Sequence, residues 1–217
     1  AGSYIPRTLS DRFGDVISVK DFGAKGDGAT DDTAAIQAAF DYHVGGKHGG
    51  KIVFSSGTYI VTDSIILKNR SRVHTLDGDV YSTQWPHVDL CGSSIAWHGP
   101  DNEKPVLIVS ANNGLIEGGQ ILGAPKNAAG DNHRALACVK ITSEYGSPFA
   151  FRMDNMQLNG YTRCGLMIGD EDHLGSYGCQ ISNTYITANN SIDDWENDGP
   201  AGIELFAADC KFVKVTT

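Results

Sequence analysis

Four carboxylates in the last quarter of this chain are candidates for catalysis: Asp170, Asp172, Glu204 and Asp209. Hydrolysis of a glycosidic bond needs two carboxyl groups, one protonated to assist the leaving oxygen and one ionised as base or nucleophile. The two groups lie about 5 Å apart in retaining enzymes and about 6.5–9.5 Å apart in inverting ones. The acids therefore predict a glycan-cleaving site if the fold brings residues of different segments into one groove. Each of them is otherwise an ordinary solvated loop acid.

The side chains around these acids suggest how a sugar would be held, and four are candidates for binding it: Trp195, Glu171, His173 and Arg163. Trp195 stands in an acidic segment, residues 193–198, where its ring could stack on the face of a sugar. The residues 170–173 form a second dense polar segment directly after an apolar run. We predict no cofactor and no metal ion for this site.

Elimination is the alternative chemistry, and it leaves the choice between hydrolase and lyase open. A lyase abstracts the proton beside a uronate carboxyl with Arg, Lys, His or Tyr as base. Lys140, Arg163 and the pair His133–Arg134 supply such residue types. Trp85 and Trp97 are better explained as core or edge aromatics than as a sugar platform. The chain has no Gly-x-Ser-x-Gly sequence, so a serine esterase has little support.

The elements that would position these residues begin near the N-terminus. A short strand around residues 17–19 is followed by glycines at 23, 26 and 28 and by a helix that starts within 30–33. Thr30 or Asp31 can accept the free N–H groups of the first helical turn. Ile36 and Phe40 lie four residues apart, which predicts one narrow apolar stripe flanked by alanines. The aspartates of this turn would repel a phosphate and lack the spacing of a calcium loop, so capping explains them best.

Two kinds of strand then alternate along the second half of the chain. One kind spans 136–145, 163–172 and 200–209, and its apolar–variable–apolar centres align Lys140, Met167 and Glu204 as outward residues. The other spans 152–160, 180–188 and 211–217, with 115–123 as a looser member. In this alignment Asp172 and Asp209 are equivalent residues of consecutive coils. A strand pattern that recurs every roughly 27 to 37 residues predicts a parallel solenoid.

The same alignment predicts which residues stack. Inward residues should form vertical columns at the strand spacing of about 4.8 Å, with these members: Val139, Ile141, Leu166, Ile168, Ile203 and Leu205. In the second series Met153, Ile181 and Phe212 correspond, and Asn155 corresponds to Asn183 at a turn. Stacked amides at that turn could bond to neighbouring coils, and Lys214 would end the ladder. The chain stops on a strand with no second cap, so we expect it to be part of a longer protein.

Composition limits the class of protein. The chain has 217 residues and a formal charge of −9, with no basic patch, which argues against nucleic-acid binding. No apolar run is long enough to span a membrane. Five cysteines, at 91, 138, 164, 179 and 210, are an odd number without CxxC spacing. They predict buried free thiols rather than a disulfide framework or a zinc site, as suits assembly in a reducing cytoplasm.

The segment ISVKDFGAKGDGATDDTAAIQAAF (17–40), followed by KIVFSSGTYIV (51–61), resembles the beginning of right-handed parallel β-helices of the pectate-lyase superfamily. Within that superfamily it looks most like bacteriophage tailspikes and capsule depolymerases, and TLSDRFGD (8–15) adds to the likeness. The resemblance implies an all-β, single-stranded right-handed parallel β-helix with a short capping α-helix. Residues 1–16 would be a leading segment, 17–50 the cap and 51–217 the coils.

The resemblance also implies a function. The chain would belong to a tailspike depolymerase that binds a bacterial capsular polysaccharide or lipopolysaccharide O-antigen and cleaves it, most simply by glycoside hydrolysis. The full-length protein would be a homotrimer in the virion tail, assembled in the host cytoplasm, without membrane insertion. Three alternatives stay open: a polysaccharide lyase on the same fold, a non-catalytic carbohydrate-binding or structural tail-fibre fragment, and a secreted bacterial enzyme that degrades pectin or exopolysaccharide.

Overall fold

The computed structural model describes residues 6, 8, 15–45, 51–68, 73–75, 78–80, 85–100, 103–123, 134–146, 148–173, 175, 177–187, 201–206 and 209–217. Several predictions lie outside these residues: the acidic segment with Trp195, His133, most of the leading segment and the glycine hinge after the helix. They stay predictions.

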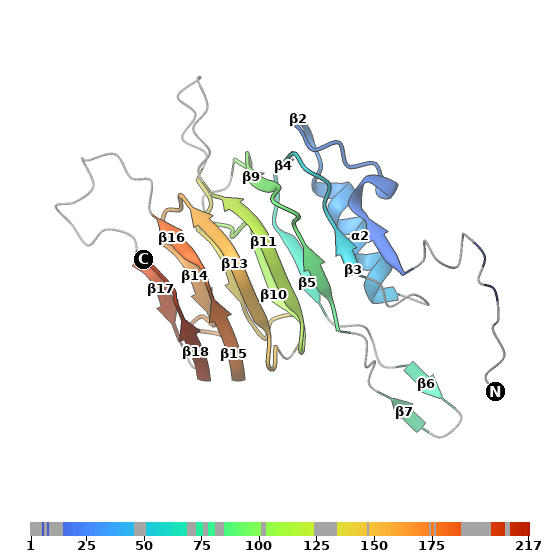
Figure 1. Cartoon of the computed structure of the whole chain (residues 1–217). Helices are drawn as coiled ribbons and strands as arrows, with labels where there is room; N and C mark the ends of the chain where they lie inside the picture. Colours follow the sequence, from blue (N-terminus) through green and yellow to red (C-terminus); the bar gives the residue numbers. More distant parts are fainter. Residues whose placement is uncertain are drawn as a thin grey trace.

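The described strands wind into coils with three faces (Figure 1). Face 1 contains β1 (Val16–Ser18), β3 (Lys51–Val53), β8 (His87–Asp89), the first halves of β11 (Leu115–Leu122) and β13 (Arg152–Asn159), β15 (Tyr177–Ser182) and β18 (Asp209–Val213). Face 2 contains β2 (Asp27–Asp31), β4 (Thr58–Val61), β9 (Ser94–Trp97), the second halves of β11 and β13, and β16 (Tyr185–Thr187). Face 3 contains β5 (Ile65–Lys68), β10 (Leu107–Ser110), β12 (Ala137–Ile141), β14 (Cys164–Ile168) and β17 (Ala201–Leu205).

Within the described residues every strand pairing on these faces is parallel, and the antiparallel exception is a hairpin that projects from the coils. The hairpin joins β6 (Val73–Thr75) to β7 (Gly78–Val80), and Figure 1 shows it standing apart from the three faces. Equivalent strands of successive coils lie side by side, as a solenoid requires. The predicted parallel β-helix with one N-terminal α-helix is therefore confirmed.

The core is a set of vertical columns of apolar side chains. On face 1 the column runs through consecutive register partners that are all buried: Ile17, Ile52, Val88, Ile116, Met153 and Ile181. Phe212 continues it in β18 and is partly buried. The predicted correspondence of Met153, Ile181 and Phe212 is confirmed. Because no coil can bury its inward side chains alone, this column ties each coil to the next.

The predicted register on face 3 is also confirmed. Lys140 pairs with Met167 and Met167 with Glu204, so the three residues lie in one outward row. Three exposures differ from the expectation. Leu205 is predicted to be buried but is 54% exposed, and Ile203 is only partly buried, because β17 is the outermost described strand of its sheet. Met167 points outward yet is only 2% exposed, because it packs in a small outer cluster with Ala137 and Cys164 that Phe206 borders.

Helix α2 (Thr33–Gly45) closes one end of the coils (Figure 1). Ile36 and Phe40 are buried, as predicted. Gln37 lies under β5 and satisfies its open edge: its Nε2 donates to Ile66 O at 3.1 Å, and its Oε1 accepts from Ile66 N at 2.8 Å. One side-chain amide thus replaces a strand, which limits the exposed edge that a solenoid end would otherwise present.

The polar residues before α2 have different roles from those predicted. Asp31 accepts the N–H of Thr33 at 3.0 Å, which confirms its capping role. Asp27–Asp31 is strand β2, so the helix begins at Thr33, and Thr30 bonds back to Asp27. The buried Asp32 carboxylate instead accepts the N–H groups of Lys25 and Gly26, at 2.6 and 2.9 Å. It holds the preceding glycine turn against the helix.

Two corners flank face 1, and at both the backbone turns through the left-handed region. After face 1 the corner residues are Gly118, Asn155, Asn183 and Lys214, with φ of 74°, 52°, 47° and 51°. The predicted asparagine turn is confirmed, and Asn183 Nδ2 donates to Asp154 Oδ1 of the previous coil, at 2.8 Å. Before face 1 the corner residues are Asn113, Ala150 and Gly178, with φ of 50°, 52° and 69°.

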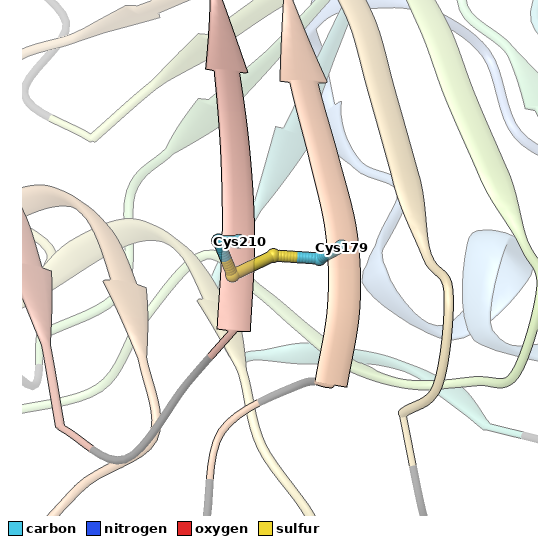
Figure 2. The surroundings of a disulfide bond; sticks show 2 residues. All are labelled: Cys179 and Cys210. Carbon is cyan, nitrogen blue, oxygen red and sulfur yellow. A yellow bond between two sulfur atoms is a disulfide. The ribbon is translucent and has the colours of Figure 1, made fainter.

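The prediction of five buried free thiols is wrong for three cysteines. Cys179 and Cys210 form a disulfide between the adjacent strands β15 and β18 (Figure 2). They are 31 residues apart, about one coil, so register brings them together although no local spacing indicates a pair. Cys91 is exposed. Cys138 and Cys164 are buried and free as expected, and burial raises the pKa of each thiol to about 12.

Candidate active site

The predicted acid Asp170 lies in the turn after β14, and its carboxylate already has hydrogen-bond partners within the protein. Its carboxylate accepts from Lys140 Nζ at 2.5 Å, from the N–H of His173 at 2.6 Å and from the N–H of Asp172 at 3.0 Å. Partial burial acts to raise the pKa of Asp170, but the bonds from Lys140 and the His173 N–H outweigh it and lower the pKa to about 2. A carboxylate held in this way stays ionised and is a poor proton donor.

Glu204 and Arg163 are brought together by the fold. The Nε of Arg163 donates to both carboxylate oxygens of Glu204, at 2.8 and 3.1 Å, and the guanidinium lies 5.5 Å from the centre of the Phe206 ring. A predicted catalytic acid and a predicted binding residue thus neutralise each other. The arrangement covers the small apolar cluster around Met167 on the outside of face 3.

The proposed equivalence of Asp172 and Asp209 is wrong. Asp209 belongs to β18 on face 1, where its register partner is Tyr177, whereas Asp172 lies in the turn after β14 on face 3. The segment between β14 and β15 is longer than that between β17 and β18, so residues aligned up to Ile168 diverge beyond it. Glu171 is exposed in the same turn, and His173 Nδ1 lies 3.0 Å from Asp170 Oδ1.

A different set of carboxylates is stacked by the coils. Asp89, Glu117 and Asp154 are register partners in β8, β11 and β13, on the outward side of face 1. We call these three residues the carboxylate row. Neighbouring members come from adjacent coils, so their backbones are about 4.8 Å apart. The side chains of Asp89 and Glu117 are 21% and 30% exposed, which leaves them accessible to a ligand.

A lysine and a histidine flank this row. Lys51 in β3 contacts the carboxylate of Asp89, and its Nζ lies 3.6 Å from Glu117 Oε1. His87 Nε2 lies 2.6 Å from the same Glu117 oxygen. The hydrogen bond from Lys51 to Asp89 raises the pKa of Lys51, so the ammonium is charged at neutral pH. Glu117 therefore has a permanent cation on one side and a titratable ring on the other.

The two aspartates of the row are held as anions. Partial burial acts to raise the pKa of Asp89, but the bonds from Lys51 and from the Cys91 N–H, the latter at 2.8 Å, lower it overall. Asp154 accepts from Ser182 Oγ at 2.6 Å and from Asn183 Nδ2 at 2.8 Å, and these two bonds lower its pKa. Asp154 thus lies next to Glu117, which in turn contacts His87, and these are residue types that acid–base catalysis uses.

The sequence carries a signal for this row. Each carboxylate directly follows a buried residue of the face 1 column, in the dipeptides Val88-Asp89, Ile116-Glu117 and Met153-Asp154. The apolar pattern of residues 152–160 matches 115–123 only loosely and does not point to β8. The apolar residue before each acid aligns all three segments and places the carboxylates in one row.

A cleft of about 560 Å³ lies elsewhere, between α2, the turn of residues 62–64 and strand β5. Its acidic lining residues already have partners, since Asp31 accepts from Thr62 Oγ1 at 2.7 Å and Asp63 from Lys104 at 3.0 Å. Among the described residues no group of three or more His, Cys, Asp and Glu is arranged to hold a metal ion. No helix in the described part of the chain is long and apolar enough to cross a membrane.

Comparison with known proteins agrees with this architecture. Residues 16–84 match the family model described as rhamnogalacturonase A/epimerase, pectate lyase-like. The match covers the N-terminal third of the chain, and the coils that follow continue the same parallel β-helix.

The particular proteins that the chain resembles differ in what they do. Plasmin and fibronectin-binding protein A of Streptococcus pneumoniae is 43% identical over 77 residues, which is 33% of this chain and 11% of that protein. Alginate lyase 7 of Azotobacter vinelandii is 61% identical over 46 residues, 21% of this chain and 5% of that one. The chain therefore spans only a small part of the curated relatives that it matches.

Solved structures resemble the chain over nearly its full length. ORF18 of Geobacillus virus E2 matches with a TM-score of 0.60 and 19% identity, over 95% of this chain and 43% of that one. The Dettilon tailspike protein matches at 0.56 and 15%, over 99% and 41%. The iota-carrageenase of A. fortis matches at 0.60 and 18%, over 91% and 39%. At these identities the likeness establishes the fold.

Proposed function

We propose that the chain is part of a depolymerase that binds and cleaves a bacterial surface polysaccharide, either capsule or O-antigen, by glycoside hydrolysis. The observation that carries the proposal is the carboxylate row, in which the fold stacks three acids on one accessible surface. The likeness to a viral protein, a tailspike and a carrageenase supports a polysaccharide-binding or polysaccharide-cleaving role. A place in a phage tail as a homotrimer belongs to the same proposal.

In the proposed reaction Glu117 is the general acid and Asp154 the nucleophile. Glu117 gives its proton to the glycosidic oxygen as that bond breaks, and the carboxylate of Asp154 bonds to the anomeric carbon. Water then hydrolyses the glycosyl ester and returns a proton to Glu117. The backbones of Glu117 and Asp154 lie on adjacent strands, about 4.8 Å apart, which puts the two side chains within reach of one sugar unit. With Asp154 as nucleophile the product keeps the anomeric configuration of the substrate, as in retaining enzymes.

Elimination is the second candidate, because His87 and Lys51 adjoin the row. His87 would take the proton next to a uronate carboxylate, and Lys51 would offset the charge of that carboxylate. The local identity to an alginate lyase supports this reading. A competing proposal places the site on face 3, with these residues: Asp170, Asp172, Glu204, Arg163 and His173. Asp209, Glu171 and Trp195 belong to the same proposal.

The test is incubation of the chain with a panel of purified capsular and O-antigen polysaccharides. New reducing ends without absorbance near 235 nm indicate hydrolysis, and that absorbance indicates elimination. Glu117→Gln and Asp154→Asn should each lower the rate about 10²–10⁴-fold. The matched controls Asp170→Asn and Glu204→Gln should keep activity within a few-fold. The opposite result would move the site to face 3, and binding without any cleavage would refute the enzymatic proposal.

A further inference from the structure

Three exposed aromatic side chains lie along the corner before face 1. Trp85 is 56% exposed, Phe149 54% and Tyr177 53%. Phe149 and Tyr177 are parallel bridge partners in adjacent coils, so their backbones are about 4.8 Å apart. Trp85 precedes His87 by two residues, in the coil below β11. Phe149 and Tyr177 thus lie side by side along the direction in which the coils stack. Trp85 lies two coils below Phe149, at the corner position equivalent to Ala150.

The backbone under the two stacked rings is fixed from both sides. Phe149 N donates to Asn112 Oδ1 at 2.9 Å, and its carbonyl accepts from Asn113 N at 2.6 Å. Ala150 N donates to the carbonyl of Tyr177 at 2.8 Å. Ala150 has a φ of 52°, in the left-handed region that also forms the equivalent corners at Asn113 and Gly178. The corner geometry therefore fixes where the side chain next to it leaves the coil.

Polar side chains accompany these rings on the same outward side. Three register partners in β13, β15 and β18 are polar: Arg152, Gln180 and Lys211. Arg152 follows Phe149 by three residues, and Gln180 follows Tyr177 by three. A sugar has an apolar face of C–H groups and a rim of hydroxyl groups. Rings beside an arginine, an amide and a lysine fit that combination.

We propose that Phe149 and Tyr177, with Trp85 at the lower end, form a sugar-stacking platform for a polysaccharide. The platform rests on the proposed function, because it serves the same face as the carboxylate row. From Ala150 to Asp154 the strand advances about 13 Å at about 3.3 Å per residue. A glycan that touches both the rings and the carboxylates therefore spans several sugar units, so the platform binds sugars away from the bond that is cleaved.

The experiment is affinity electrophoresis of the full chain in native gels that contain iota-carrageenan, alginate, a capsular polysaccharide or dextran. Phe149→Ala and Tyr177→Ala should each weaken retardation about tenfold or more on the polymer that retards the unmodified chain. Phe149→Leu and Tyr177→Leu keep apolar volume without a ring face and should weaken it as well. Tyr185→Ala is the matched control, since Tyr185 is 50% exposed on face 2 and should not matter.

The outcomes separate the two proposals. Binding that is lost in the ring variants without any cleavage by the unmodified chain upholds the platform and refutes the hydrolase. Cleavage with unchanged retardation in the ring variants refutes the platform alone. An equal loss in Tyr185→Ala also refutes it, and retardation by none of the four polymers overturns both. Thermal unfolding of each variant identifies losses that come from misfolding.

Discussion

Removal of the Cys179–Cys210 disulfide should destabilise the last described coil. The bond joins β15 to β18, and β18 is the outermost strand of face 1, so only one neighbouring strand holds it. Phe212 is only partly buried there, in contrast to the fully buried Met153 two coils below. The covalent link therefore supplies stability that packing alone gives the inner coils.

The size of the effect follows from the length of the closed loop. A disulfide that closes 31 residues removes about 12 cal/mol/K from the entropy of the unfolded chain, or about 3.7 kcal/mol at 25 °C. Replacement of both cysteines by alanine should lower the free energy of unfolding of this region by about 3 to 4 kcal/mol. Because solenoid coils unfold partly independently, β18 should open before the inner coils.

The measurement combines a thiol count with unfolding. The unreduced protein in denaturant should react with three equivalents of a thiol reagent, and the reduced protein with five, since Cys91, Cys138 and Cys164 are free. Urea unfolding with and without a phosphine reductant then gives the stability difference. The Cys179→Ala/Cys210→Ala variant should match the reduced protein and respond no further to reductant.

The control is Cys91→Ser, because Cys91 is exposed and forms no disulfide. This variant should lose one reactive thiol and keep the full response to reductant. Five reactive thiols without reductant would refute the bond itself. A confirmed bond whose reduction leaves unfolding and proteolysis of the C-terminal coil unchanged would refute the argument from loop entropy.

Three further predictions concern the cap, the corners and the acids. Ala150→Gly should stabilise the chain by about 0.5–1 kcal/mol in urea unfolding, because glycine relieves the positive φ, and Gly178→Ala at the equivalent corner should cost about 1 kcal/mol. Gln37→Leu should lower stability by about 1–2 kcal/mol, since both bonds to Ile66 are lost, and hydrogen exchange should locate the change in β5. Asp170→Asn should cost about 1–2 kcal/mol at pH 7 and almost nothing near pH 2. The folded pKa of Asp170 is lowered to about 2, so its contribution is present above the unfolded value near 3.8 and disappears as pH falls through 2.

The fold was predictable because its signals are local or periodic. The glycine turn and the acids of residues 17–40 mark the cap, and the register of Lys140, Met167 and Glu204 follows from one apolar pattern repeated in three coils. The exposure of Leu205 was not predictable from that pattern, since it depends on which strand lies outermost. The Cys179–Cys210 bond depends in the same way on coil length, which is visible only after the coils are aligned.

The site was less predictable, because carboxylate density in the sequence is not carboxylate proximity in the fold. The dense segment at 170–173 holds Asp170, which folds back on its own turn and on Lys140. The row of Asp89, Glu117 and Asp154 has one acid in each of three coils and no local enrichment at all. Its members are brought together by register alone, so a search for clusters in the sequence passes over them.

The balance of charge explains why the row, rather than face 3, is the better candidate for catalysis. On face 3 Asp170 is held by Lys140, which also lies 3.6 Å from Glu144, and Glu204 is held by Arg163. In the carboxylate row of face 1, Asp89 and Glu117 share the single ammonium of Lys51. Like charges on directly opposed strand positions repel each other, and at Glu117 the nearby Lys51 and His87 offset this repulsion. Three acids gathered in one row at an accessible surface, beside a histidine, are the pattern expected where function contributes to the choice of side chains.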